Sequence, residues 1–442
     1  MAKPADLMEK IVSLAKRRGF VFHGSEIYGG LAGTWDYGPR GVALKENIKR
    51  LWWRMFVDER DDIYGLDAAI LMNEKVWEAS GHTGAGFTDP VVECKKGHRF
   101  RADQLEDKTK CPECGEPFGE ERAFNLMFET QVGVEGNTKS YLRPETAQGI
   151  FANFKNVVDS INPKLPFGIA QIGKAFRNEI APRDFVFRAR EFEQMEVEYF
   201  VKEENWEASF ELWHGVMHAY AAALGIDKKH IHDIEIEDND RAHYSKRTID
   251  MEFDFPFGQK ELWGLAYRTN HDLVQHTQAS GEQLVYREEF SSGVNTFIPH
   301  VIEPSLGLDR TVLAVLVSAY REDKLGGETR TYLALKPSIA PVKAMVSPLL
   351  KNKPELMEKA REVYEALKKE VPQVAWDDNG NIGKRYRRQD EIGTPYCITI
   401  DFDTLGENPE HKDTVTVRDR DTGEQERMSI EKAIKKVVET LK

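Results

Sequence analysis

Phe176-Arg177-Asn178-Glu179, followed by Arg188 and Phe192, is the stretch of the chain that decides its fold. The segments on either side, residues 167–175 and 192–201, alternate between apolar and polar residues or are apolar throughout, as β-strands are. The stretch therefore predicts two strands joined by a polar loop. Side chains alternate between the two faces of a strand, so the arginine and the glutamate of the first motif would point into the same cleft.

A second motif, Glu303-Pro304-Ser305-Leu306-Gly307-Leu308-Asp309-Arg310, lies much later in the chain and opens an apolar helix. Together the two motifs supply three cations, Arg177, Arg188 and Arg310, and the aromatic ring of Phe192. Arginine stays charged and can hold phosphate oxygens through two hydrogen bonds. This set suits a bent ATP. Arg177 would bind the α-phosphate and neutralise the charge that develops when a carboxylate attacks it. Arg188 and Arg310 would hold the outer phosphates, and Phe192 would lie on the adenine ring.

Taken alone, each charged residue is at least as often a solvated surface group as part of a nucleotide site, and the phenylalanine is at least as often a core residue. Their joint occurrence at matching spacing favours a nucleotide site. The returning strand can present Phe192 and Glu196 to the same cleft. The sequence contains no Gly-rich phosphate loop of the Walker type, and its histidines have no spacing that suggests a Ser-His-Asp triad.

The composition is that of a globular protein with two or three domains, because 40% of its 442 residues are hydrophobic and 31% are charged. No apolar stretch is long enough to span a bilayer, and residues 5–20 predict an amphipathic helix rather than a secretory signal. We therefore expect a cytoplasmic protein that does not enter a membrane. The net charge of −13 argues against non-specific coating of nucleic acid. It leaves an RNA partner open, because a local basic stripe can bind a polyanion.

Residues 81–140 interrupt the pattern of helices and strands with glycines, charged residues and a cysteine cluster, and we interpret them as an insertion. Around the insertion, helices are predicted for residues 39–62, 206–224 and 306–320, and strands for residues 63–71 and 296–303. A boundary is predicted near Gly326-Gly327. Residues 1–80 and 141–327 would form one domain, and residues 328–442 a second.

The second domain is predicted from alternating strands and helices. Strands are expected at residues 341–347, 374–377, 395–401 and 414–418, and helices at residues 355–369, 382–392 and 430–441. Alternation of this kind favours a small α/β domain around a mostly parallel sheet.

Cys94-x3-His98 and Cys111-x2-Cys114 have the spacing of a zinc site. Cys-x2-Cys followed by a glycine forms a tight knuckle, and three thiolates with one imidazole complete a tetrahedron around Zn²⁺. Four protein ligands leave no open position, so the predicted zinc is structural. Three unrelated thiols are the alternative. Because three of the four cysteines lie here, the sequence favours a metal site in a reducing compartment over disulfide bonds.

Phe-Arg-x-Glu, Arg-x3-Phe and Gly-Leu-Asp-Arg resemble motifs 2 and 3 of the class II aminoacyl-tRNA synthetases. Residues 36–41, Asp-Tyr-Gly-Pro-Arg-Gly, resemble motif 1, the dimer-forming element of that class. Further segments resemble the glycyl branch of the homodimeric type: Asn47-Ile48 with Trp52-Trp53, residues 141–149, Arg190-Glu191-Phe192, residues 264–269 and Glu303-Pro304-Ser305. Motif 3 commonly holds more glycine than Ser305-Leu306-Gly307 does, a departure that agrees with the glycyl branch. The resemblance covers nearly the whole chain.

This resemblance implies an α+β fold in which an antiparallel sheet flanked by helices carries an adenylation site. It also implies a zinc-binding insertion and a C-terminal α/β anticodon-binding domain. Matched residue by residue, the catalytic residues are Arg177 and Arg310, and the ATP-binding residues are Arg177, Glu179, Arg188, Phe192 and Arg310. Glu179 would meet the adenine edge.

The glycine-binding residues implied by the resemblance are Glu145, Glu196 and Glu303, which would hold the amino group, and Ser305 beside the Cα hydrogens. The chemistry agrees, because an ammonium group has three donors and needs several acceptors. Glycine offers no side chain to recognise, so selectivity would come from leaving no room for a methyl group. Larger competitors are excluded sterically, and no editing domain is required.

The implied reaction is the activation of glycine with ATP and Mg²⁺ to glycyl-adenylate, and its transfer to the 3′ end of tRNA(Gly) by a homodimer. In the C-terminal domain, the basic residues that are candidates for tRNA binding are Lys384, Arg385, Arg387 and Arg388. An aromatic residue inside this run suits stacking on unpaired bases. A solvated helix face is the usual alternative for such a run.

Three other functions fit parts of the sequence. A sister synthetase for histidine, proline or threonine would share the motifs. A non-catalytic nucleic-acid-binding relative is expected to lose the phosphate-binding arginines, whereas this chain keeps all three. An ATP-dependent ligase acting on a small molecule would share the catalytic fold, and the C-terminal domain argues against it.

Overall fold

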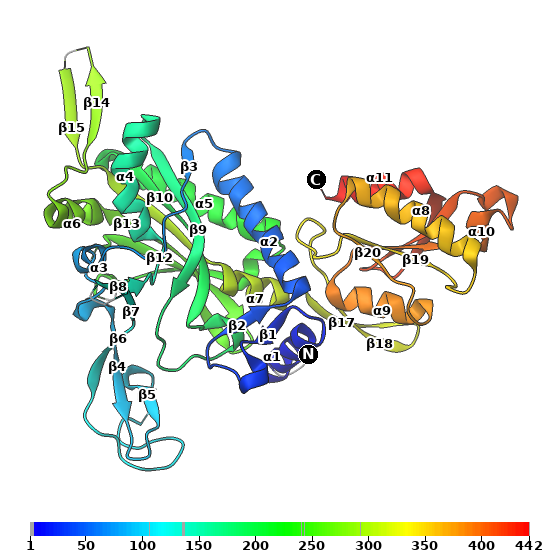
Figure 1. The fold of residues 1–442 in the computed structure, drawn as a ribbon, viewed down its shortest axis with the longest axis horizontal. Coiled ribbons are helices and arrows are strands. Elements are labelled where there is room, and N and C mark those ends of the chain that lie inside the picture. Colours follow the sequence, from blue (N-terminus) through cyan, green and yellow to red (C-terminus); the bar gives the residue numbers. More distant parts are fainter. Residues whose placement is uncertain are drawn as a thin grey trace.

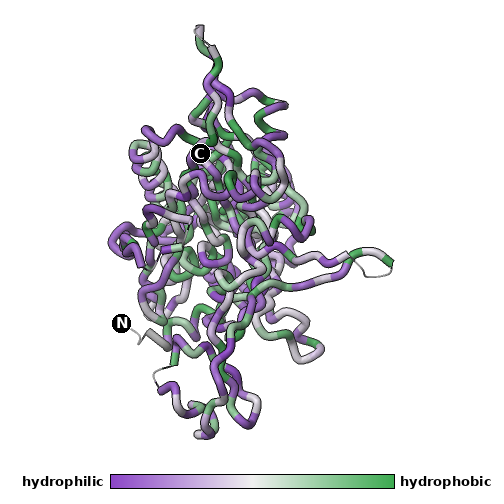
Figure 2. Tube along the Cα trace, turned by 90° about the vertical axis from the view of Figure 1, so that its left-hand side faces the viewer, coloured by the Kyte–Doolittle hydropathy of each residue, from purple (hydrophilic) through white to green (hydrophobic). Residues whose placement is uncertain are grey.

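The computed structural model describes residues 4–105, 107–134, 138–239, 241–242, 244–291 and 293–441. It divides into a large body that contains the N-terminus and a smaller body at the C-terminal end, orange and red in Figure 1. Coloured by hydropathy, the chain shows hydrophobic stretches through the interior and hydrophilic stretches along much of the outline (Figure 2). No helix among the described residues is both long and apolar enough to cross a membrane.

The large body is built on a seven-stranded sheet. Its strands, in spatial order, are β11 (Ile231–Glu235), β12 (Arg247–Phe255), β13 (Gly258–Thr269), β16 (His300–Gly307), β10 (Glu191–Val201), β9 (Phe167–Phe176) and β3 (Ile63–Gly65). All neighbours pair antiparallel except β3 and β9. The predicted antiparallel sheet of an α+β fold is therefore confirmed.

Helices cover both faces of this sheet. The helices of the large body are α1 (Pro4–Arg17), α2 (Pro39–Trp53), α3 (Glu74–Ala79), α4 (Ala147–Ile161), α5 (Trp206–Leu224), α6 (His271–Ser280) and α7 (Leu308–Ala319). One core cluster joins α2, α5 and α7 to Met195 and Val197 of β10, and a second joins α4 and α6 to Phe200. Because side chains alternate along a strand, Glu196 lies on the same face as Phe200.

Several predicted elements match the structure and others are shorter. The predicted helix at residues 206–224 is confirmed, because its apolar side chains at helical spacing are buried and Gly225 ends it with φ of 83°. The helix expected at residues 39–62 ends at Trp53 and continues as a π-turn over Arg54–Asp58. The strand expected at residues 63–71 spans only Ile63–Gly65.

Small sheets surround the main one. They are β1 (Val21–His23) with β2 (Trp35–Tyr37), β4 (Thr88–Glu93) between β5 (Arg99–Arg101) and β6 (Arg122–Asn125), β7 (Phe128–Val132) with β8 (Thr138–Leu142), and β14 (Tyr286–Phe290) with β15 (Gly293–Phe297). In Figure 1 the segment with β4 and β5 extends from one end of the large body and the β14–β15 hairpin from the other. The strand expected at residues 296–303 is divided between β15 and β16.

A hairpin connects the two bodies. It consists of β17 (Tyr320–Leu325) and β18 (Glu328–Leu333), with Gly326 and Gly327 at its tip, both at positive φ. The predicted boundary thus falls in a turn that needs a left-handed backbone. The bodies also touch directly, because the side-chain amide of Gln373 in the small body donates to the Asn47 side-chain oxygen of α2 at 3.1 Å.

The small body is a five-stranded sheet with helices. Its elements are β19 (Ala344–Pro348), β20 (Val374–Trp376), β21 (Tyr396–Ile400), β22 (Thr414–Asp419), β23 (Gln425–Ser429), α8 (Pro354–Glu370), α9 (Ile382–Ile392), α10 (Phe402–Leu405) and α11 (Ile430–Thr440). The order is β20-β19-β21-β22-β23, with β19 parallel to both neighbours and the remaining pairs antiparallel. The α/β class is confirmed, but half of the pairings are antiparallel because β22 and β23 form a terminal hairpin.

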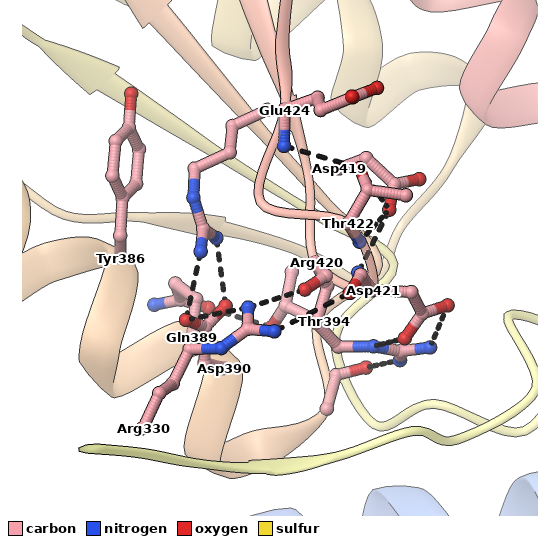
Figure 3. Close-up of polar contacts among 12 residues, drawn as sticks. Arg330, Tyr386, Gln389, Asp390, Thr394, Asp419, Arg420, Asp421, Thr422 and Glu424 are labelled. Atoms are coloured by element: carbon pink, nitrogen blue, oxygen red, sulfur yellow. Dashed lines mark hydrogen bonds and ion pairs between the residues drawn. The ribbon is translucent and has the colours of Figure 1, made fainter. Parts of the chain in front are cut away.

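A buried polar network fastens the connecting hairpin to the small body. Arg418 donates to both oxygens of Asp390 at 2.8 and 3.0 Å. Arg330, from β18, lies 3.5 Å from the same carboxylate and donates to the Arg420 carbonyl at 2.6 Å (Figure 3). Asp390 is fully buried and both arginines are at most 3% exposed. A buried charge needs partners of this kind, so the network fixes the position of β18 against α9.

Candidate active site

The structure brings the five predicted ATP-binding residues to one cavity. Arg177, Glu179, Arg188, Phe192 and Arg310 all line it. They come from the β9–β10 loop, the start of β10 and the N-terminal turn of α7. Three guanidinium groups around one aromatic ring make this cavity strongly cationic, which suits a polyphosphate.

Arg177 and Glu179 lie in a loop and not in a strand. The prediction that strand alternation directs both side chains into one cleft was therefore wrong in its reason. Strand β9 ends at Phe176, and the chain continues as a loop. The loop is held because the Arg177 N–H donates to the Arg190 carbonyl at 2.9 Å and its Nε donates to the Pro144 carbonyl at 3.1 Å. These bonds leave the rest of the guanidinium available to a ligand, with its carbon atom 5.5 Å from the centre of the Phe192 ring.

The other two arginines of the cavity, Arg310 and Arg188, contact carboxylates. Arg310 lies 2.9 Å from a Glu261 carboxylate oxygen and 4.6 Å from the centre of the Phe187 ring. Arg188 lies 3.8 Å from the Glu179 carboxylate. Arg310 lowers the pKa of Glu261, so that glutamate is ionised at neutral pH. Glu261 was not predicted as a site residue.

Asp309 positions the helix that carries Arg310. Its carboxylate accepts from the Tyr37 hydroxyl at 2.6 Å and from the Glu193 N–H at 2.7 Å. Lys45 from α2 lies 3.6 Å away and also pairs with Glu193. The start of α7 is therefore tied to β2, α2 and β10, the segments around the predicted motif 1.

A cluster of buried carboxylates lies beside the cationic cavity. Glu196 accepts from the Thr146 N–H at 3.0 Å, from the Thr146 hydroxyl, and from the Ser305 hydroxyl at 2.7 Å. Ser305 also lines the cavity of the arginines. This serine therefore joins the two halves of the site.

The predicted Glu145 and Glu303 belong to the same cluster. Glu303 accepts from Arg268 at 2.7 Å. Glu145 accepts from Gln148 at 2.9 Å and lies 3.4 Å from His82. Among the described residues, the structure thus gathers all the predicted glycine-binding residues into one region.

Arg268 is a buried cation at the centre of this cluster that was not predicted as a site residue. It is 1% exposed, donates to both oxygens of Asp272 at 2.9 and 2.8 Å, and lies 3.9 Å from the centre of the Tyr244 ring. Its segment, residues 264–269, contributed to the family resemblance. Because Arg268 is buried away from water, its positive charge is stabilised by the carboxylates of Asp272 and Glu303.

The carboxylates have shifted pKa values because they are buried close together. Burial raises the pKa of Glu303 to about 8; Glu196 and Glu145 add to the rise and Arg268 opposes it. Burial and Glu145 likewise raise the pKa of Glu196. Burial also acts to raise the pKa of Glu145, but His82 and Arg268 outweigh it and hold that pKa well below its usual range. If all of these carboxylates were ionised together, their negative charge would exceed what Arg268 balances, so a bound cation would favour the ionised forms.

Glu198 is a second unpredicted member of this region. It is fully buried, and neither of its carboxylate oxygens has a hydrogen-bond partner among the described residues. It lies two residues after Glu196 on β10, hence on the same face of the sheet. Burial and the neighbouring Glu303 raise its pKa well above the ordinary value, which keeps the carboxyl neutral.

The four predicted metal ligands converge in the insertion. The ligand atoms of Cys94, His98, Cys111 and Cys114 all lie within 4.8 Å of one another. The sulfurs of Cys94 and Cys114 are 3.7 Å apart, and the Cys111 sulfur is 3.4 Å from His98 Nδ1. Tetrahedral Zn²⁺ with ordinary bond lengths needs separations of about 3.6–3.8 Å between such atoms.

Two tight turns position the metal ligands. The Gly97 N–H donates to the Cys94 carbonyl and the Gly115 N–H to the Cys111 carbonyl, each at 2.8 Å. Both glycines have positive φ, of 82° and 73°. The donor set and its geometry therefore fit a structural zinc ion.

The basic run on α9 is largely engaged within the small body. Arg385 is 2% exposed and donates to the Ser347 hydroxyl at 2.7 Å and to three backbone carbonyls. Arg388 binds both oxygens of Asp377, and Arg387 contacts Glu328 at 3.1 Å, while Lys384 is exposed. The buried Arg385 thus holds the domain together rather than facing RNA. The prediction of tRNA contact stays a prediction for the other three residues.

Comparisons with known proteins cover nearly all of this chain. A family model described as the tRNA synthetase class II core domain (G, H, P, S and T) matches residues 128–319, and one described as an anticodon-binding domain matches residues 343–440. The chain is 50% identical to glycine–tRNA ligase of Caldanaerobacter subterraneus subsp. tengcongensis over 98% of both chains. It is 50% identical to that of Clostridium acetobutylicum over 100% of both, and 51% identical to that of Geobacillus thermodenitrificans over 96% of both.

Proposed function

Because this chain belongs to the glycine–tRNA ligase family of the class II aminoacyl-tRNA synthetases, we propose that it activates glycine with ATP and transfers it to the 3′ end of tRNA(Gly). One observation carries the proposal: Ser305 lines the arginine cavity and donates to Glu196 of the carboxylate cluster. A phosphate-binding half and an ammonium-binding half thus meet at one residue. That is the arrangement required to join an amino acid to the α-phosphate of ATP.

Activation needs positioning and charge neutralisation rather than a protein nucleophile. A glycine carboxylate oxygen attacks the α-phosphorus, a new P–O bond forms, and the bond to the β-phosphate oxygen breaks to release pyrophosphate. We assign Arg177 to the α-phosphate, where it neutralises developing charge, and Arg188 and Arg310 to the outer phosphates. Phe192 would stack on adenine with Glu179 at its edge. Mg²⁺, when bound, would add charge neutralisation at the phosphates.

Glycine selection is assigned to the carboxylate cluster. Glu145, Glu196 and Glu303 would surround the ammonium group, with Ser305 beside the Cα hydrogens. In the second step, the 3′-terminal hydroxyl of tRNA attacks the glycyl carbonyl carbon, an ester forms, and AMP leaves. The C-terminal domain would bind the anticodon, with Lys384, Arg387 and Arg388 as candidate contacts.

We also propose a domain division, a metal site and an assembly. Residues 1–80 and 141–327 would form the catalytic domain, residues 81–140 the zinc-binding insertion, and residues 328–442 the anticodon-binding domain. The Cys94, His98, Cys111 and Cys114 cluster would hold one structural Zn²⁺. The protein would act as a homodimer in the cytoplasm.

Amino-acid-dependent exchange of pyrophosphate into ATP tests the proposal. Glycine should support exchange, and alanine, serine, histidine, proline and threonine should not. Arg177→Ala should abolish exchange, while Arg183→Ala, on the same loop but exposed and outside the cavity lining, should retain it. Exchange with histidine or threonine but not glycine would assign the chain to a sister synthetase. ATP binding that is unchanged in Arg177→Ala would favour a non-catalytic module.

A further inference from the structure

A group of two histidines and one aspartate lies on the large body, separate from the active site and from the cysteine cluster. Among the described residues, three or more potential metal ligands come within 4.8 Å of one another at two places, the cysteine cluster and the set His214, His218 and Asp233. His214 and His218 are one helical turn apart on α5, and Asp233 lies on β11. Neither element contributes a residue to the cavity of the arginines.

Local structure fixes this arrangement. Helix α5 packs into the core through residues that include Trp213 and Met217, each directly preceding a histidine of the set. Residues four apart on a helix lie on the same face, so the two imidazoles lie side by side, next to the helix face that packs into the core. Strand β11 is at the edge of the sheet and, among the described residues, pairs with β12 alone, so the Asp233 side chain can reach the two histidines.

The donor atoms converge on a common region. The Nε2 atoms of His214 and His218 lie 3.1 and 2.9 Å from the same oxygen, Oδ2 of Asp233. The His214 atom is buried and makes no hydrogen bond among the described residues, although it is this close to the carboxylate. A tetrahedral ion bound by imidazole nitrogen and carboxylate oxygen holds those atoms about 3.3 Å apart. The separations of 3.1 and 2.9 Å are somewhat shorter than that value, and the 2.9 Å contact is a hydrogen bond between His218 and Asp233 that a bound ion would replace.

We propose that His214, His218 and Asp233 form a second binding site for a transition-metal ion of the Zn²⁺ class. Two imidazoles and one carboxylate are a ligand set that Zn²⁺ accepts, with a water molecule in the fourth position. The side chains are 21%, 18% and 32% exposed, so the site lies close to the surface of the large body. The bound ion would join α5 to the edge strand β11 and stabilise the large body.

A neighbouring set of the same residue types provides an internal comparison. His230 Nδ1 lies 3.1 Å from Oδ2 of Asp254, whereas His232 Nε2 lies 2.9 Å from the other oxygen, Oδ1. These imidazoles contact different oxygens of one carboxylate, and the set does not converge within 4.8 Å. It matches the proposed site in composition and charge but not in geometry.

The test is a metal titration of the full chain with one Zn²⁺ already bound at the cysteine cluster. Calorimetry with added Zn²⁺, and metal counting after gel filtration, should show one further equivalent. His218→Asn should weaken that equivalent by more than the roughly 10- to 100-fold that loss of an outer hydrogen-bond partner costs. His232→Asn should bind it as the unchanged protein does. Zn²⁺ should also raise the melting temperature of the unchanged protein more than that of His218→Asn.

Two results would overturn the proposal. One is an unchanged protein that takes up no Zn²⁺ beyond the first equivalent. The other is a second equivalent that survives in both His218→Asn and Asp233→Asn. Pyrophosphate exchange should be the same in all variants, which verifies that each is folded. If His218→Asn loses that activity, Asp233→Asn, whose side chain is more exposed, provides the same comparison.

Discussion

Replacing Glu196 by glutamine removes one negative charge from the carboxylate cluster without changing the shape of the side chain. In the structure this carboxylate accepts from the Thr146 N–H, the Thr146 hydroxyl and the Ser305 hydroxyl. A glutamine amide can keep the acceptor role at one atom only. If that atom faces Thr146, the NH₂ group donates to the Ser305 hydroxyl, which can then no longer donate to this side chain. The substitution therefore weakens both the attraction for the glycine ammonium and the positioning of Ser305.

The size of the effect follows from the lost interaction. A hydrogen bond to a charged group contributes about 1.5–3 kcal/mol, and each 1.4 kcal/mol is about a tenfold change in affinity. In Glu196→Gln the KM for glycine should rise by roughly 10- to 150-fold. The KM for ATP should stay within about twofold, because the arginines and Phe192 that line the cavity are untouched.

Steady-state pyrophosphate exchange at varied glycine and at varied ATP measures both constants. Glu191→Gln is the matched control, since Glu191 lies on the same strand but is exposed and pairs with Lys174; its KM for glycine should not change. A Glu196→Gln protein with an unaltered KM for glycine would refute the assignment of this carboxylate to the ammonium group. An equal loss for both substrates would point to a general disturbance of the fold.

Three further predictions concern buried charges. Because the pKa of Glu303 is about 8 in the free protein and an ammonium group favours the carboxylate, glycine binding should release a proton below that pH and tighten from pH 6 to 8. Calorimetry in two buffers of different ionisation enthalpy measures the release, and its absence would contradict the cluster. The raised pKa of Glu198 means that folded protein retains a proton which unfolded protein loses above about pH 4.3, so stability falls as pH rises from there. Glu198→Gln should flatten this fall in urea unfolding between pH 5 and 8, and an unchanged slope would show that Glu198 has a partner. Asp390→Ala leaves Arg418 and Arg330 buried without their shared carboxylate and should cost about 3–5 kcal/mol of stability in denaturant unfolding, whereas a loss under 1 kcal/mol would show that water reaches the network.

Elements with strong periodicity could be predicted from the sequence. The helices at residues 206–224 and 382–392 match α5 and α9 to the residue, because their buried side chains recur at helical spacing. The predicted end of α2 was wrong, because the π-turn that follows the helix does not interrupt the apolar pattern of the sequence. Strand β23 was missed because none of its residues is fully buried, so that only its pairing with β22 defines it.

The cationic half of the site could be predicted because its residues occur in recognisable motifs. Arg268, Glu198 and Glu261 could not, since a single charged residue in a strand has the same local pattern whether it faces solvent or a buried cluster. Arg268 also pairs with a residue that is distant in the sequence, Glu303, so no local motif contains both residues. Arg385 illustrates the opposite error: a basic run indicates a polyanion site only if its residues face outward, and which face of α9 is buried depends on packing against β19 and its loop.

A crystal structure with a non-hydrolysable glycyl-adenylate analogue tests the central claim most directly. The adenine ring should stack on Phe192, the linking group that replaces the α-phosphate should contact Arg177, and the amino group should lie within about 2.7–3.2 Å of oxygens from Glu145, Glu196 or Glu303. An amino group directed away from these carboxylates, or a space beside the glycine Cα large enough for a methyl group, would contradict the account.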